Sequence, residues 1–127
     1  MTELKKRRVS HRGCKEKGSN YEREIAEYLS KATGLVVRRA LLSGGGRHEG
    51  AADLEGLVGI SAELKRTEKL NVYDAMAQSI STSGRTKEVP VVITRRNGVL
   101  TQDSLVIMRL SDWTRIYQEA KLPRSGH

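Results

Sequence analysis

Residues 52–65, with the sequence ADLEGLVGISAELK, place two short apolar segments on either side of a turn bounded by glycines. A loop of about three residues at 57–59 is a common hairpin length when a glycine adopts the left-handed conformation. This loop sets Asp53 opposite Glu63. Since side chains alternate with period two along a strand, Glu63 and Lys65 then share a face with Asp53. The stretch therefore predicts two antiparallel strands that bring two carboxylates and an ammonium together.

The charged cluster on this predicted hairpin admits two interpretations. Charged side chains on the open face of a hairpin often form only an ion-paired solvent face. Alternatively, Asp53 and Glu63 hold a hard divalent cation, because a few carboxylate oxygens, with water completing the shell, suit Mg²⁺ or Mn²⁺.

Two segments have the apolar periodicity of amphipathic helices. Residues 19–32 show this spacing and are followed by Gly34, a typical C-terminal stop. Residues 71–83 show it again, with Asn71 as the N-cap and Gly84 at the end. Both helices are expected to bury one face against a sheet.

Strands are expected at 35–39, 88–94 and 105–110, in addition to the hairpin. The 88–94 segment is apolar on both faces and reads VPVVI, as in a central strand. A last helix over 111–120, capped by Ser111, is expected to turn three apolar side chains inward: Trp113, Ile116 and Tyr117.

The resulting order, α-β-β-β-α-β-β-α, indicates a single α/β (α+β) domain with a central mixed five-stranded β-sheet flanked by helices. A length of 127 residues suits one domain with one core. We expect a basic flexible N-terminal arm at 1–17, the folded domain at 18–122 and a frayed C-terminal tail at 123–127.

Residues 40–51 contain four glycines, so we expect a flexible loop immediately before Asp53. Loops in such a position commonly close over a substrate. His48 lies in this loop as a possible general acid, although a lone histidine there is more often only polar.

The formal net charge of +8 points to a polyanionic partner, with nucleic acid favoured over a membrane. Five of these charges come from residues 1–17, which carry seven lysines and arginines against two glutamates. This arm is expected to lie along phosphates, and the alternative is a solubilising tail.

We find no apolar run of about 18 residues and no signal-peptide core, so a soluble, cytoplasmic protein is expected. A single cysteine, Cys14, excludes an internal disulfide and a cysteine-built zinc site.

Asp53, followed by Glu63-Leu64-Lys65, resembles the D…E-x-K signature of the PD-(D/E)-x-K nuclease superfamily. The segments KGSNYEREIAEYL and VVRRALLSGGG precede the hairpin in an order similar to that of archaeal-type Holliday-junction resolvases. This resemblance covers roughly residues 15–80 and implies a restriction-endonuclease-like fold. It also implies a Mg²⁺-dependent endonuclease, with Mn²⁺ able to substitute, that cuts four-way DNA junctions as a homodimer.

The resemblance assigns roles to individual residues. Asp53, Glu63 and the Leu64 carbonyl would coordinate the metal, and Lys65 would orient or deprotonate the attacking water and stabilise negative charge. Ser43 would assist at the active site, because Arg39-x-x-x-Ser43 resembles the R-x-x-x-S of those resolvases. The side chains expected to contact DNA are Lys5, Lys6, Arg7, Arg8, Arg23, Arg38, Arg39 and Arg47.

Glu22 admits two roles. It has capping-box spacing from Ser19, in which its carboxylate only returns to the Ser19 backbone N–H. By its match to K-G-x-x-x-E-R it would instead belong to the active site, completing the metal site or binding a second metal. Glu24 is the reserve candidate, and Arg23 is expected to face DNA or the subunit interface.

Two departures from the family pattern lower the specificity of the substrate assignment. Ala52 stands where the family often has proline, and the glycine-rich loop changes the spacing to Asp53. Another nuclease of the superfamily, of the nicking or restriction type and acting on duplex DNA, is therefore an alternative. A non-catalytic DNA-binding protein is the second alternative. Such a protein would be expected to lack one of the motif residues, whereas Asp53, Glu63 and Lys65 are all present.

The late part of the chain carries more apolar surface than a thin sheet with two helices needs. This surface spans 89–93, 105–110 and the helix with Trp113. It supports a dimer, because symmetric cuts on opposed strands call for two sites related by a two-fold axis. The alternative is that all of it is core.

Overall fold

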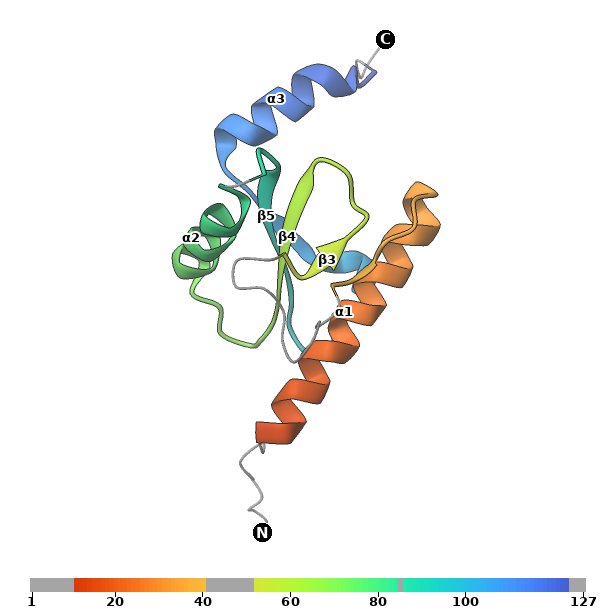
Figure 1. Cartoon of the computed structure of the whole chain (residues 1–127), viewed down its shortest axis with the longest axis vertical. Helices are drawn as coiled ribbons and strands as arrows, with labels where there is room; N and C mark the ends of the chain where they lie inside the picture. Colours follow the sequence, from red (N-terminus) through yellow and green to blue (C-terminus); the bar gives the residue numbers. More distant parts are fainter. Residues whose placement is uncertain (1–10, 41–51, 85, 124–127) are drawn as a thin grey trace.

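The computed structural model describes residues 11–40, 52–84 and 86–123. Their helices and strands follow the predicted order, with one short 3-10 helix added (Figure 1). The elements are α1 (His11–Thr33), β2 (Arg38–Arg39), β3 (Leu54–Glu55), β4 (Ile60–Arg66), α2 (Val72–Ser83), β5 (Val89–Arg95), η1 (Thr101–Asp103), β6 (Leu105–Ile107) and α3 (Leu110–Ala120).

The described strands form two sheets, so the prediction of one five-stranded sheet is wrong for this part of the chain. β5 lies between β4, to which it is parallel, and β6, to which it is antiparallel. β2 and β3 form a separate antiparallel pair of two residues each. Between β3 and β4 the Asp53 N–H donates to the Ala62 carbonyl at 3.0 Å, but no ladder forms. The predicted hairpin therefore brings its two arms together without pairing them as strands.

Gly56 explains why β3 turns toward β2. Its φ is +95°, and a Cβ added there would lie 2.0 Å from the Val36 carbonyl oxygen. Only glycine permits that approach at this backbone angle. Gly59, with φ +85°, supplies the second left-handed position of the predicted turn.

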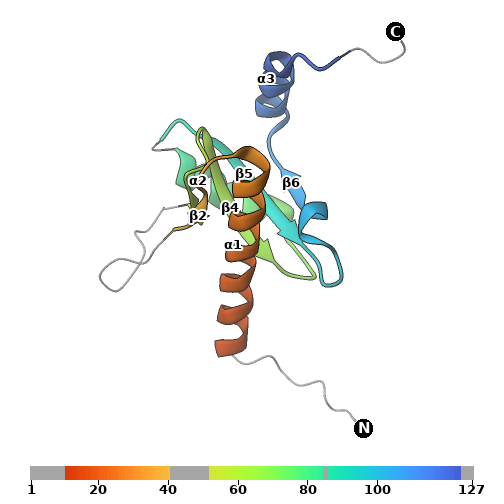
Figure 2. The ribbon, with the colours of Figure 1, turned by 90° about the vertical axis from the view of Figure 1, so that its right-hand side faces the viewer.

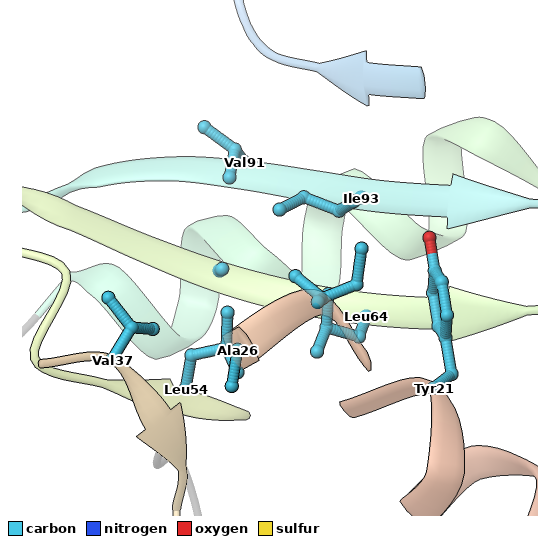
Figure 3. Packing of buried hydrophobic residues seen from close by; sticks show 9 residues of the cluster. Tyr21, Ala26, Val37, Leu54, Leu64, Val91 and Ile93 are labelled. Atoms are coloured by element: carbon cyan, nitrogen blue, oxygen red, sulfur yellow. The ribbon is translucent and has the colours of Figure 1, made fainter. Parts of the chain in front are cut away.

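α1 and α2 cover opposite faces of the β4–β5 layer (Figure 2). On the α1 side, Tyr21, Ile25 and Ala26 pack against Leu64 and Ile93 (Figure 3). On the α2 side, Ala75 and Met76 pack against Val92. Both faces of β5 are thus buried, which confirms its prediction as a central strand.

α1 begins at His11, eight residues before the predicted start at Ser19. Ser19 is therefore internal to the helix, where a backbone N–H bonds to the carbonyl four residues earlier and needs no cap. The capping-box role of Glu22 is wrong for this reason.

The predicted arm is also wrong in part, since residues 11–17 are helical, while residues 1–10 lie outside the described part of the chain. The predicted stop is confirmed, because Gly34 has φ +80° and donates to the Ser30 carbonyl at 2.9 Å.

α2 matches its prediction. The Asn71 side chain accepts a hydrogen bond from the Asp74 N–H at 3.0 Å, and the helix ends before Gly84. No helix in the described residues is long and apolar enough to cross a membrane.

The C-terminal elements depart most from expectation. β6 is three residues long, and α3 starts at Leu110 with Arg109, not Ser111, at the N-cap position. The helix projects from the end of the sheet rather than covering it (Figure 2). The prediction that this helix turns its apolar side chains inward is wrong. Trp113 is 50% exposed, Ile116 is 38% exposed and Tyr117 is 51% exposed.

Candidate active site

β4 carries Glu63 and Lys65 on one face. The Lys65 Nζ lies 3.9 Å from the Glu63 Oε2, which confirms that these two residues share a face. Glu63 is 6% exposed, whereas the Lys65 side chain is one-third exposed. The Thr94 hydroxyl, on the neighbouring β5, donates to the Lys65 carbonyl at 2.7 Å and holds the backbone there.

Asp53 connects three segments of the chain. Its carbonyl accepts from the Ala40 N–H at 2.8 Å, and its own N–H donates to Ala62. Its Oδ2 accepts from the Leu64 N–H at 2.8 Å, and the residue is 5% exposed. The side chain thus takes a backbone donor of β4 that a paired strand would otherwise use. This is why β3 and β4 do not continue as a ladder, and it sets the Asp53 carboxylate against the backbone between Glu63 and Lys65.

α1 directs its two candidate carboxylates to different places. The Glu22 Oε1 lies 3.3 Å from the Arg39 Nε, and Arg39 precedes the Ala40 that bonds to Asp53. The Glu24 Oε1 instead lies 2.9 Å from Arg95 Nη2, at the end of β5. Glu22, and not the reserve candidate Glu24, therefore lies on the β2 side of α1, next to the segment that holds Asp53.

A partly buried polar network connects α1 to the end of β5. The Arg95 guanidinium lies 5.1 Å from the centre of the Tyr21 ring and donates to Thr101 at 3.0 Å, in addition to its pair with Glu24. The Tyr21 hydroxyl donates to Ser104 at 2.8 Å, and burial raises the pKa of Tyr21 despite that bond and the nearby Arg95 charge. This network was not predicted from the sequence, because Arg95 lies just beyond the strand expected at 88–94, whereas it ends β5 with a side chain only 12% exposed.

The remaining site candidates divide into exposed residues and residues outside the described part of the chain. Arg23 is exposed on α1 and donates to Asn20 on the same helix, and Arg38 is exposed on β2. The others lie outside the described residues: Lys5, Lys6, Arg7, Arg8, Ser43, Arg47 and His48.

The chemistry of the donor set fits a hard cation. Asp53, whose carboxylate accepts from the Leu64 N–H, and Glu63, the residue before Leu64 in β4, supply carboxylate oxygens, the ligand type that Mg²⁺ prefers when water fills the other positions. Within the described residues no three His, Cys, Asp or Glu side chains come together as a metal cluster. Glu22 pairs with Arg39, whose neighbour Ala40 donates to the Asp53 carbonyl.

Comparison with known proteins identifies the family of this chain. The model of a family described as "Phage putative PDDEXK endonuclease" matches residues 13–125. A search of curated proteins and a search of solved structures each found no match. The matched segment contains Asp53, Glu63 and Lys65 and covers most of the chain. The chain therefore belongs to the phage PDDEXK endonuclease family.

Proposed function

We propose that this protein is a metal-dependent endonuclease that hydrolyses DNA phosphodiester bonds at Asp53, Glu63 and Lys65. One observation carries the proposal: the Asp53 carboxylate, in a residue 5% exposed, accepts from the Leu64 N–H, and Glu63, 6% exposed, precedes Leu64 and pairs with the one-third-exposed side chain of Lys65. The family match supports the same activity.

Burial separates this proposal from the solvent-face interpretation. Ion pairs on an open strand face are solvated and cost little to form. Asp53 and Glu63 are almost fully buried, and burying carboxylates costs free energy unless specific partners or a cation compensate. Such an arrangement is typical of a functional site.

The chain's own residues define the proposed chemistry. Asp53, Glu63 and the Leu64 carbonyl would hold Mg²⁺ or Mn²⁺, which when bound supplies a Lewis acid for the developing charge on the phosphoryl group. Lys65 would contact the scissile phosphate and the attacking water, with its ammonium held in place by Glu63. Glu22 would support the site through its pair with Arg39, and Ser43 would assist the reaction.

The substrate class we propose is the four-way DNA junction, cut by a homodimer. This rests on the resemblance of the residues before the hairpin to resolvases and on the basic segment that precedes the domain. Two symmetric cuts on opposed strands require two sites, which a two-fold dimer supplies.

Cleavage of labelled four-way junction, duplex and flap substrates, compared side by side with Mg²⁺, tests the proposal. We expect junction cleavage that EDTA abolishes and that Mn²⁺ restores. Asp53→Asn and Glu63→Gln are expected to abolish cleavage while DNA binding survives, because the phosphate contacts remain. Glu55→Gln, an exposed carboxylate on β3, is the matched control and should cut normally.

Three outcomes would overturn parts of the proposal. Full cleavage by both carboxylate variants would refute the active-site assignment. Equal cutting of junction and duplex would replace the resolvase with a duplex nuclease. Binding without cleavage under either metal would leave a DNA-binding protein.

A further inference from the structure

α3 carries an apolar face that no described residue of its own chain covers. Trp113 and Tyr117 stack with ring centres 5.1 Å apart, and both are about half exposed. Leu110, 75% exposed, precedes Trp113 by three residues and continues the same stripe. A helix of 11 residues is marginal by itself in water, and helices in proteins depend mainly on packing of such a face. The stripe therefore calls for a partner surface.

A groove of about 370 Å³ lies at the base of this helix. Apolar side chains of α2 form one wall, and Ile107 and Met108, at the end of β6, form the other. Tyr73, on the rim, is 87% exposed, and Ala77 lies exposed on the groove wall. The described part of the chain thus offers an open apolar groove beside α2 and an apolar helix face on α3.

The short connection between β6 and α3 directs the helix away from the groove of its own chain. Only Met108 and Arg109 separate β6 from the helix, and Arg109 is extended, with φ −69° and ψ 145°. Asp112 fixes this exit, because its carboxylate accepts from Arg109 at 2.9 Å and from Arg115 at 2.8 Å. Figure 2 shows the helix leaving the sheet rather than folding back over α2.

We propose that two copies of this chain exchange α3, so that the Trp113 face of each helix fills the α2 groove of the other. A two-fold axis pairs the groove of each chain with the helix of the other, so that both contacts form in one closed dimer. Arg109 is the charged residue that lines the groove, and Asp112 already neutralises it, so docking buries no unpaired charge there. The described start of α1 and the helix α3 lie at opposite ends of the molecule, which keeps the basic segment of 11–17 away from the contact (Figure 1).

The exchange deepens the proposed function, since it names the surface that would form the nuclease dimer. It depends on the apolar surfaces alone and is measured without DNA or metal. If the exchange of α3 is refuted, the proposed cleavage activity is still tested separately by the cleavage assay.

Trp113 is the only tryptophan in the chain and reports directly on this contact. Sedimentation across a dilution series should give a dimer of twice the 14.1 kDa chain mass that dissociates on dilution. The emission of Trp113 should shift to longer wavelength over the same concentrations, because dissociation returns the indole to water.

Two variants disable opposite halves of the contact. Ala77→Arg blocks the groove, and Tyr117→Lys disrupts the helix face. Each is expected to raise the dimer dissociation constant by about 30-fold or more, the effect of losing a central anchor. Mixing the two should restore a heterodimer, because the intact helix of the first fits the intact groove of the second. Val58→Lys, which charges an exposed apolar residue in the β3–β4 turn, is the matched control and should leave the dimer unchanged.

Circular dichroism confirms that each variant is folded, and Tyr73→Lys on the groove rim replaces Ala77→Arg if that variant is not. A monomer at all concentrations would overturn the exchange, whatever the Trp113 emission. A dimer that neither the groove variant nor Tyr117→Lys weakens would place the interface elsewhere and overturn the exchange as well.

Discussion

Glu22 and Glu24 lie two residues apart on α1, and their replacement by glutamine is expected to have opposite effects. Glu24→Gln should lower stability and leave cleavage intact, because Glu24 neutralises the nearly buried Arg95. Glu22→Gln should lower cleavage and leave stability almost intact, because Glu22 holds Arg39 beside the segment that carries Asp53.

The magnitudes follow from exposure and from the partners that remain. The Arg95 side chain is 12% exposed, but Glu24 is 47% exposed, so solvent already screens the pair. Arg95 also keeps its bond to Thr101 and its contact with Tyr21. We expect a loss of about 1–2 kcal/mol for Glu24→Gln, the cost of removing one partner of a partly buried charge. A domain of this size loses about 4 °C of melting temperature per kcal/mol. For Glu22→Gln we expect a stability change under about 1 kcal/mol and about a 10- to 100-fold loss of cleavage, as for residues that support metal ligands.

Thermal unfolding and single-turnover cleavage of a labelled junction, measured on both variants, test this pair. Each variant is the control for the other, since both remove one negative charge from the same helix. Equal loss of cleavage in the two variants would mean that the loss comes from the changed charge of α1, and would refute the assignment of Glu22. A different result would be that Glu22→Gln loses much stability while the folded variant cleaves normally. That result would show that the ion pair between Glu22 and Arg39 is purely structural.

Two further perturbations test the fold and the basic segment. Gly56→Ala is expected to cost about 3 kcal/mol and Gly59→Ala about 1 kcal/mol by denaturant unfolding. Both positions have positive φ, but only the Cβ at 56 meets the Val36 carbonyl, and equal costs would contradict that close contact. Deleting residues 1–10 is expected to weaken DNA binding and to reduce its salt slope by about one unit for each lost phosphate contact. An unchanged slope would reduce this segment to a solubilising tail.

Local signals in the sequence determined the order of elements and several of their ends. Asn71 caps α2 because its side chain meets an N–H three residues away, and Gly34 ends α1 because it adopts positive φ. Such features depend on neighbouring residues, so periodicity and turn chemistry suffice to predict them. The shared face of Glu63 and Lys65 was predictable for the same reason, since it follows from the alternation along one strand.

The start of α1 shows where local apolar patterns mislead. Residues 11–18 have almost no apolar stripe, and this pattern predicts a flexible arm for most of them. Lysine, arginine and glutamate are good helix formers, and they extend a helix that packing has already established further along. The absence of periodicity therefore did not exclude a helix.

Only the tertiary structure decided which surfaces meet. The split into two sheets depends on the Asp53 carboxylate taking the Leu64 N–H, a contact between residues 11 positions apart. The choice between Glu22 and Glu24 depends on where Arg39 and Arg95 lie around α1. The exposure of Trp113 depends on the extended exit at Arg109. Periodicity marks a face as apolar, but it does not encode what covers that face, because the partner is distant in sequence or belongs to another chain.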